Sequence, residues 1–78
     1  MNIKELKKIA KELEILENKF KNDYGLNRIS GGFVQINMID YNKEYIFINV
    51  KDGIQSDCTN SVNTEILKLD RKTIKLIN

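Results

Sequence analysis

The sequence predicts an α+β fold in which an N-terminal amphipathic helix packs on one face of a small antiparallel β-sheet of three to five strands. Two observations predict this class. Residues 3–22 repeat apolar side chains at the three- and four-residue steps of a helix. Residues 33–50 hold two runs rich in Val, Ile, Phe and Tyr, separated by polar turn residues. At 78 residues, the chain is expected to form a single small domain, 1–78, with one core.

The helix predicted at residues 3–22 has a recognisable signal at each end. Asn2 is placed to cap the first turn with Glu5 as its capping-box partner, and Gly25 stands where a left-handed residue ends a helix. We expect the apolar stripe of the helix to cover the aliphatic face of the sheet. This stripe comprises Ile3, Leu6, Ile9, Ala10, Leu13, Leu16 and Phe20.

The runs Phe33 to Tyr41 and Tyr45 to Val50 predict an antiparallel hairpin. A three-residue loop at 42–44 pairs Asn37 with Asn49, Ile39 with Phe47 and Tyr41 with Tyr45. This register gathers the aliphatic side chains on one face, whereas a loop of Asn42 and Lys43 alone mixes both faces. We therefore prefer the three-residue loop. The second face then carries Phe33, Ile39, Tyr41, Tyr45 and Phe47.

The later elements are less distinct in the sequence. Residues 51–53, Lys-Asp-Gly, predict a second hairpin turn that leads into a short strand with Ile54, Ser56 and Cys58 on the aliphatic face. Cys58 is then expected to be a small core residue. Residues 59–64 are expected to form a polar linker. Residues 62–77 fit either a second helix or a hairpin of Glu65–Leu69 with Thr73–Ile77, and the β-branched content favours the hairpin.

The composition excludes several classes of function. The chain has 13 basic and 11 acidic residues, a net charge of +2, which does not by itself indicate nucleic acid or a membrane as partner. Because it has no His and one Cys, the usual nucleophile–base pairs and zinc sites cannot be assembled. We expect no catalytic residue, metal or cofactor. The lone cysteine and the lack of a long apolar run indicate a cytoplasmic protein without a membrane span.

A cluster of lysines is the first candidate binding site. Lys4, Lys7, Lys8 and Lys11 lie on one side of the predicted helix, and the apolar Ile15 adjoins Lys8 and Lys11 there. A solvated helix face is one interpretation of this pattern. The other is a contact surface in which an apolar centre excludes water and the surrounding charges steer the partner. Under that hypothesis Lys8, Lys11 and Ile15 bind an acidic protein.

The aromatic face of the predicted sheet is the second candidate. Phe33, Tyr41, Tyr45 and Phe47 share it with Asn37 and Asn49. The C-terminal segment could fold over this face, a second copy of the chain or another protein could cover it, or nucleic-acid bases could stack on it. Base stacking is the least expected, because the chain has only two Arg residues and a slight net charge.

The sequence therefore favours a small non-enzymatic protein-binding or regulatory module whose partner is another protein or a second copy. Its abundance of Lys, Asn and Ile is typical of an AT-rich genome, which suits a phage or mobile-element accessory protein that inhibits a host factor by binding. The alternative is a protein that binds nucleic acid or a small anionic ligand. It would use the helix lysines, Arg28 and the Gly31-Gly32 loop, whose backbone N–H groups could form an anion nest.

Overall fold

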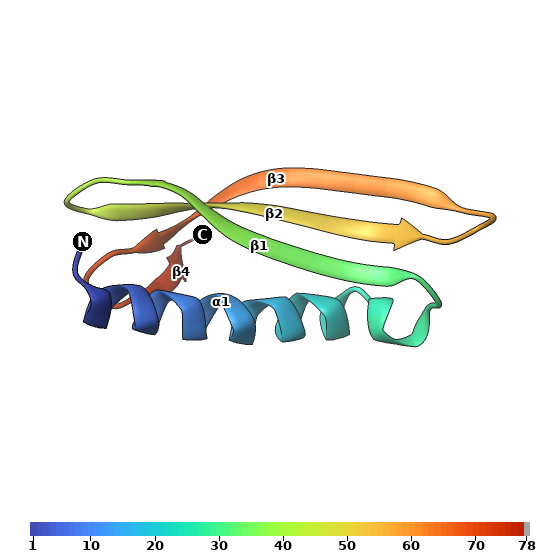
Figure 1. Cartoon of the computed structure of the whole chain (residues 1–78), viewed down its shortest axis with the longest axis horizontal. Helices are drawn as coiled ribbons and strands as arrows, with labels where there is room; N and C mark the ends of the chain where they lie inside the picture. Colours follow the sequence, from blue (N-terminus) through green and yellow to red (C-terminus); the bar gives the residue numbers. More distant parts are fainter. Residues whose placement is uncertain (78) are drawn as a thin grey trace.

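The computed structural model describes residues 1–77 as one helix beneath one twisted sheet (Figure 1). The sheet is fully antiparallel with the strand order β1-β2-β3-β4, so the predicted α+β class and strand number are confirmed. In chain order the elements are α1 (Ile3–Asp23), the short 3₁₀ helix η1 (Leu26–Arg28), β1 (Gly32–Tyr41), β2 (Tyr45–Gln55), β3 (Asn60–Asp70) and β4 (Lys75–Ile77).

Both predicted ends of α1 agree with the structure. The side-chain Oδ1 of Asn2 accepts a hydrogen bond from the backbone N–H of Glu5 at 2.8 Å, which satisfies one of the free donors of the first turn. At the other end, Gly25 has a φ of 70°, a left-handed conformation that glycine adopts without strain. The sequence therefore placed this helix to within one residue.

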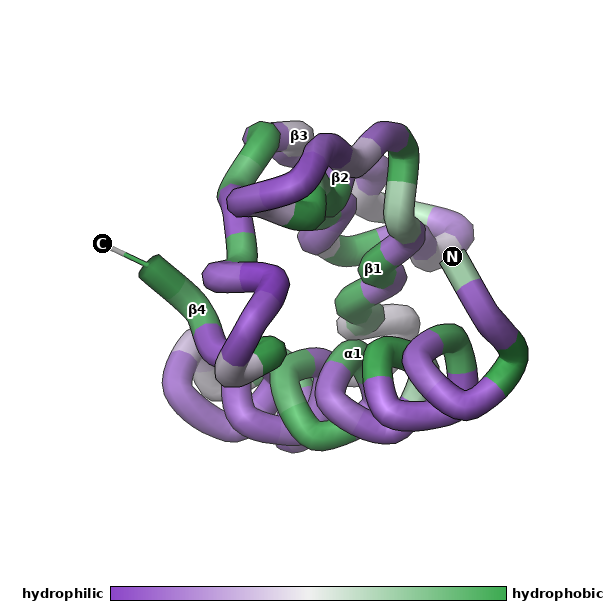
Figure 2. Tube along the Cα trace, turned by 90° about the vertical axis from the view of Figure 1, so that its left-hand side faces the viewer, coloured by the Kyte–Doolittle hydropathy of each residue, from purple (hydrophilic) through white to green (hydrophobic). Residues whose placement is uncertain are grey.

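The core lies between α1 and the sheet (Figure 2). Ile46, Ile48 and Val50 of β2 are fully buried, and α1 covers them with Ile9, Leu16 and Phe20. The predicted apolar stripe extends beyond this contact toward the N terminus of α1, because Ile3 is 72% exposed and Leu6 is 40% exposed. The helix is therefore anchored by its middle and C-terminal turns, while its first turns project beyond the core.

The first hairpin follows the predicted register only as far as Met38. Asn37 lies opposite Asn49, as expected, but a bulge between Met38 and Asp40 shifts the pairing so that Tyr41 lies opposite Ile46. The predicted pairs of Ile39 with Phe47 and Tyr41 with Tyr45 are therefore wrong. An extra residue in one strand reverses which face its later side chains occupy. The bulge thus moves Tyr41 from the aromatic face to the face that carries Ile46.

The turn predicted at residues 51–53 is wrong, because β2 runs through these residues to Gln55. Gly53 has a φ of 149°, and a side chain there would overlap the carbonyl oxygen of Ser61 on β3. Glycine is needed at this position because β2 and β3 approach each other closely here. The chain turns instead after Gln55, where the N–H of Ser56 donates to the carbonyl of Thr59 at 2.8 Å. Cys58 lies exposed in this turn and is not a core residue as predicted.

The C-terminal residues Lys75–Ile77 form the strand β4 and not a second helix. The predicted linker at 59–64 is also strand, since β3 begins at Asn60. β4 pairs antiparallel with the last three residues of β3, and both strands belong to the common four-stranded sheet. The predicted hairpin of Glu65–Leu69 with Thr73–Ile77 therefore does not exist as a unit separate from that sheet. We call the sheet face away from α1 the outer face. No described segment covers it (Figure 1).

Candidate functional site

A groove separates the N-terminal half of α1 from the turn between β3 and β4. It consists of two adjoining hollows of about 290 Å³ and 210 Å³ that share Lys8 and Ile74. We call it the basic groove. Its lining residues come from the two ends of the chain and comprise Asn2, Lys4, Glu5, Lys8, Lys11, Glu12, Ile15 and residues 71–75.

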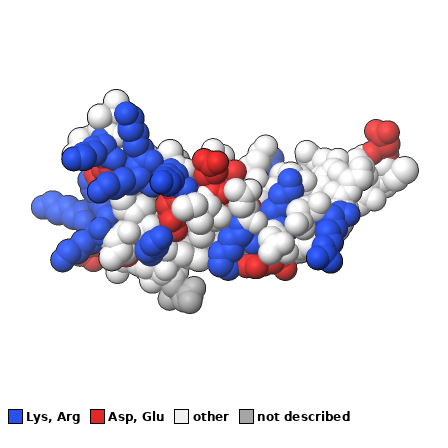
Figure 3. All heavy atoms as spheres, turned by 90° about the horizontal axis from the view of Figure 1, so that it is seen from below, with Lys and Arg blue, Asp and Glu red and all other residues white. Residues whose placement is uncertain are grey.

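Positive charge is concentrated in the basic groove. Six of its residues are cationic and two are carboxylates, a surplus of four positive charges against +2 for the whole chain. Figure 3 shows the resulting cluster of Lys and Arg at the end of the molecule that holds the helix N terminus. Four of the lysines form no ion pair with a carboxylate of residues 1–77. These four are Lys4, Lys8, Lys11 and Lys72.

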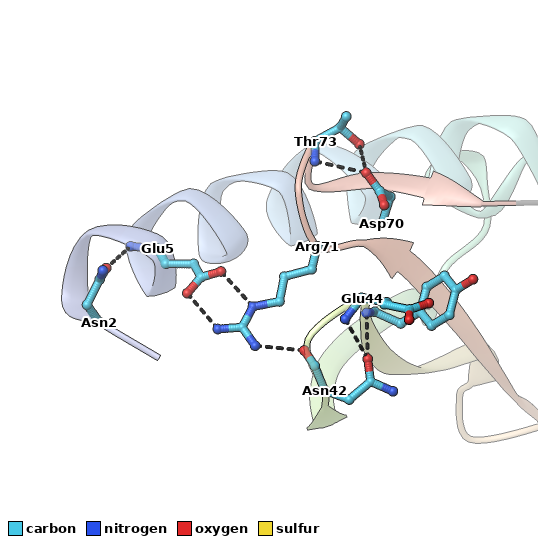
Figure 4. Close-up of polar contacts among 8 residues, drawn as sticks. Asn2, Glu5, Asn42, Glu44, Asp70, Arg71 and Thr73 are labelled. Atoms are coloured by element: carbon cyan, nitrogen blue, oxygen red, sulfur yellow. Dashed lines mark hydrogen bonds and ion pairs between the residues drawn. The ribbon is translucent and has the colours of Figure 1, made fainter.

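One wall of the groove is the turn between β3 and β4, which hydrogen bonds hold in shape (Figure 4). The carboxylate of Asp70 accepts from the backbone N–H of Thr73 at 3.0 Å and from its hydroxyl at 2.9 Å. The N–H of Ile74 donates to the carbonyl of Asp70 at 2.7 Å. Ile74 consequently adopts a φ of 56°. Such a conformation is strained for a β-branched residue, and strain of this kind is frequent at binding sites.

Arg71 connects three segments at the base of the groove (Figure 4). Its Nε and one terminal nitrogen donate to the Glu5 carboxylate at 2.9 and 3.1 Å, and its other terminal nitrogen donates to the carbonyl of Asn42 at 2.7 Å. The Tyr41 ring lies 5.2 Å from the guanidinium carbon, within the range of a cation–π contact. Arg71 therefore joins α1, the loop after β1 and the β3–β4 turn.

The ion pair between Arg71 and Glu5 alters the pKa values of both side chains. The hydrogen bond from Arg71 lowers the pKa of Glu5 below its ordinary value of 4.5, and the bond to Glu5 raises the pKa of Arg71. Because the pKa of Glu5 is depressed in the folded protein, its contribution to stability is present above pH 4.5 and is lost as the pH falls through the lowered pKa.

We expect the Arg71→Gln variant to melt at a lower temperature than the wild type near neutral pH. The difference should shrink as the pH falls through and below the ordinary carboxyl pKa of 4.5, since Glu5 then loses its charge in both proteins. Thermal melting followed by circular dichroism across this range measures the difference. Lys72→Gln is the matched control, because it removes one charge from the neighbouring position, which forms no ion pair with a described carboxylate. A pH-independent difference for Arg71→Gln would contradict the assigned role of the pair.

The structure brings part of the predicted site together and separates the rest. Lys8, Lys11 and Ile15 line one hollow, and Ile15 is 50% exposed. Phe33, Tyr45 and Phe47 are half-buried on the outer face, where the rings of Tyr45 and Phe47 lie 6.3 Å apart. Tyr41 does not join them, because the bulge turns it toward Arg71.

The Gly31-Gly32 loop lies at the other end of α1 from the basic groove (Figure 1). The helical rise between Lys8 and the end of α1 alone separates them by roughly 20 Å. In addition, the N–H of Gly32 donates to the carbonyl of Ile29 at 3.0 Å, and the carbonyl of Gly31 accepts from Gln55 at 2.9 Å. The two glycines thus connect β1 to the end of β2. The separation of roughly 20 Å counts against a single anion site built from the helix lysines and the Gly31-Gly32 loop.

Another hollow, of about 510 Å³, lies between the C-terminal end of α1 and the distal parts of β2 and β3. Its charged residues are Asp52 and Glu65. Burial, and next the charges of Glu65 and Asp52, raise the pKa of the Tyr24 hydroxyl beside them. This hollow is about as large as the two hollows of the basic groove together, but it holds only two charges, so it is the weaker candidate for charge-directed binding.

The groove residues were only half visible in the sequence. The helical spacing identified Lys4, Lys8, Lys11 and Ile15, whereas Lys7 of the predicted cluster lines neither hollow. Lys72 and Lys75 reach the groove through the turn that leads into β4. Lys75 also donates to the nearly buried carboxylate of Glu12 at 3.2 Å. A pair of residues 63 positions apart leaves no local signal in a single sequence.

No known family model, curated protein or solved structure matches this chain. Within residues 1–77, no helix combines the length and apolar character needed to cross a bilayer. In the same range, no three His, Cys, Asp or Glu side chains gather where they could hold a metal ion.

Proposed function

We propose that this protein is a non-enzymatic binding module that docks an acidic segment of another protein in the basic groove. The main support is the set of four lysines without a described carboxylate partner around the apolar side chains of Ile15 and Ile74. An acidic segment with an apolar residue at its centre complements both features. Its charges would steer the encounter, and its apolar side chain would be buried between the helix and the turn.

Several features favour a peptide over nucleic acid as the occupant. Among the described residues, no aromatic ring lines the groove, so bases would have no surface on which to stack. Arg71, the only arginine of the groove, is engaged by Glu5 and Asn42. Lys75 is also engaged, because it donates to the Glu12 carboxylate at 3.2 Å.

Binding to a peptide of repeated Glu-Glu-Leu units, measured by fluorescence anisotropy, tests this function. We expect Lys8→Glu/Lys11→Glu to weaken binding by at least about tenfold, which corresponds to about 1.4 kcal/mol. Lys43→Glu/Lys51→Glu is the matched control, because it makes the same change in net charge at exposed positions outside the groove. This control should leave the affinity within about threefold of the wild type, because exposed charges at a distance are screened by salt.

The same assay separates this function from its competitors. Ile15→Ser should also weaken binding while leaving the melting temperature unchanged, since the side chain is half exposed. A peptide of Lys-Lys-Leu units should not bind. Equal losses in the groove and control variants would contradict the groove as the site. If single-stranded oligothymidine bound more tightly than the acidic peptide, the protein would be a nucleic-acid binder instead. Its affinity for the oligonucleotide should then fall steeply as the salt concentration rises.

A further inference from the structure

The two edges of the sheet differ in how well they are protected from pairing with another strand. At the β1 edge, the Glu17 side chain of α1 accepts a hydrogen bond from the backbone N–H of Ile36 at 3.0 Å. The bulge between Met38 and Asp40 further interrupts this edge. Covered backbone donors and bulges are both devices that prevent edge-to-edge association.

The opposite edge of the sheet lacks such protection. β4 pairs only with Lys68, Leu69 and Asp70 of β3. Within residues 1–77, no strand or side chain hydrogen-bonds the free edge of β3 over residues 61–66, and every residue from Asn60 to Ile66 is exposed. This stretch contains no Lys, Pro, Gly or bulge. It is therefore an uninterrupted, extended edge with unpaired backbone groups, which is a template for a further strand.

We propose that residues 62–66 of β3 pair antiparallel with the same residues of a second copy, joining two sheets into one. In a two-fold pairing of this kind, directly opposite residues share a face of the sheet. If Thr64 lies opposite Thr64 of the second copy, then Val62 meets Ile66 on the outer face. Asn63 meets Glu65 on the face of the helix. Each of these three combinations is favourable or neutral between neighbouring strands.

The alternative registers are poorer. Centring the pairing on Asn63 places Val62 opposite Thr64 and leaves Ile66, which is 64% exposed, opposite Asn60. Centring it on Glu65 places two carboxylates directly opposite one another, which is destabilising. The register centred on Thr64 is thus selected by the side chains. It brings the exposed Val62 of one copy into contact with the exposed Ile66 of the other, and it uses none of the residues of the basic groove.

The length of the pairing sets its strength. β4 occupies the same edge from Lys68 onward, so only about five residues of each copy can pair, far fewer than in a standard protein interface. We therefore expect a weak dimer whose population rises with protein concentration. Sedimentation equilibrium should give a monomer–dimer transition, and Val62→Lys/Ile66→Lys should abolish it while keeping the circular dichroism of the fold.

Cysteine cross-linking tests the register, in a Cys58→Ser background that removes the native thiol. Opposite residues in antiparallel strands have Cα atoms about 4.5–5.5 Å apart, within the range of a disulfide. Thr64→Cys should therefore form covalent dimers under mild oxidation. Gln35→Cys is the matched control, since Gln35, Lys51 and Thr64 lie in one row on the outer face and Gln35 is at the protected edge. Thr64→Cys should react at least about tenfold faster, because pairing raises the effective thiol concentration.

A second pair of variants distinguishes edge pairing from stacking of two outer faces. A mixture of Asn63→Cys and Glu65→Cys chains should give the mixed disulfide, because these side chains meet on the face of the helix in the proposed register. Stacked outer faces would cross-link Thr64→Cys but not this mixture, and that result would overturn the proposal. So would equal rates for Thr64→Cys and Gln35→Cys, a protein that stays monomeric at submillimolar concentration, or a Val62→Lys/Ile66→Lys variant that still dimerises.

Discussion

Gly53→Ala is expected to destabilise the protein by at least about 3 kcal/mol, a large part of the stability of a domain of this size. Gly53 has a φ of 149°, a conformation open essentially to glycine alone, and a methyl group there would overlap the Ser61 carbonyl of the adjacent strand. Because the overlapping atom belongs to the backbone, β2 and β3 would have to separate. Urea unfolding followed by circular dichroism measures the loss.

Gly25→Ala is the matched control for this substitution. Gly25 also has a positive φ, of 70°, but no neighbouring atom lies within 4 Å of the position that a side-chain carbon would take. Its replacement should therefore cost only the left-handed backbone penalty, about 1 kcal/mol. Equal effects of the two substitutions would show that Gly53 is not held in close contact with β3.

The second large effect is expected at Ile48, which is fully buried in the middle of β2. Ile48→Ala should lower the free energy of unfolding by about 2–5 kcal/mol, because it removes apolar contacts and leaves a cavity between the sheet and α1. The same urea titration measures this change. A loss of this size would leave a domain of this length only marginally folded.

Ile39→Ala removes the same atoms at the bulge of β1, where the side chain is 51% exposed. We expect it to change the free energy of unfolding by less than about 0.5 kcal/mol, as surface substitutions usually do. If Ile39→Ala were as destabilising as Ile48→Ala, the core would not lie between α1 and the middle of the sheet.

Much of the fold could be predicted because its signals are local. Asn2 and Gly25 mark the ends of α1 through capping chemistry that operates within one turn. The alternation of apolar residues around Asn37 and Asn49 predicts the register of the first hairpin correctly as far as Met38, because a slip by one residue would exchange the two faces.

The errors arose where the neighbouring strand, and not the local sequence, decides the geometry. The bulge after Met38 is visible only once β1 and β2 are paired. Lys-Asp-Gly is typical of a turn, but the role of Gly53 is to admit the Ser61 backbone. The true turn did carry a signal, because the Ser56 hydroxyl accepts from the N–H of Thr59 at 3.1 Å, a common turn contact of serine.

The candidate site was predictable only on its helical side. Lys8, Lys11 and Ile15 follow from the spacing of α1, whereas Lys75 enters the groove through the pairing of β4 with β3. The strained conformation of Ile74 likewise depends on the hydrogen bonds of the turn. A surface assembled from both ends of a chain requires the tertiary structure.

Chemical-shift mapping with the Glu-Glu-Leu peptide shows whether the basic groove is the binding site, because it locates binding residue by residue. We expect the largest changes in the amide spectra at Lys8, Lys11 and Ile15 of α1 and at residues 72–75 of the facing turn. They should disappear in the Lys8→Glu/Lys11→Glu variant. Changes centred on Phe33 and Phe47 of the outer face, or no changes at peptide concentrations far above that of the protein, would contradict the basic groove as the binding site.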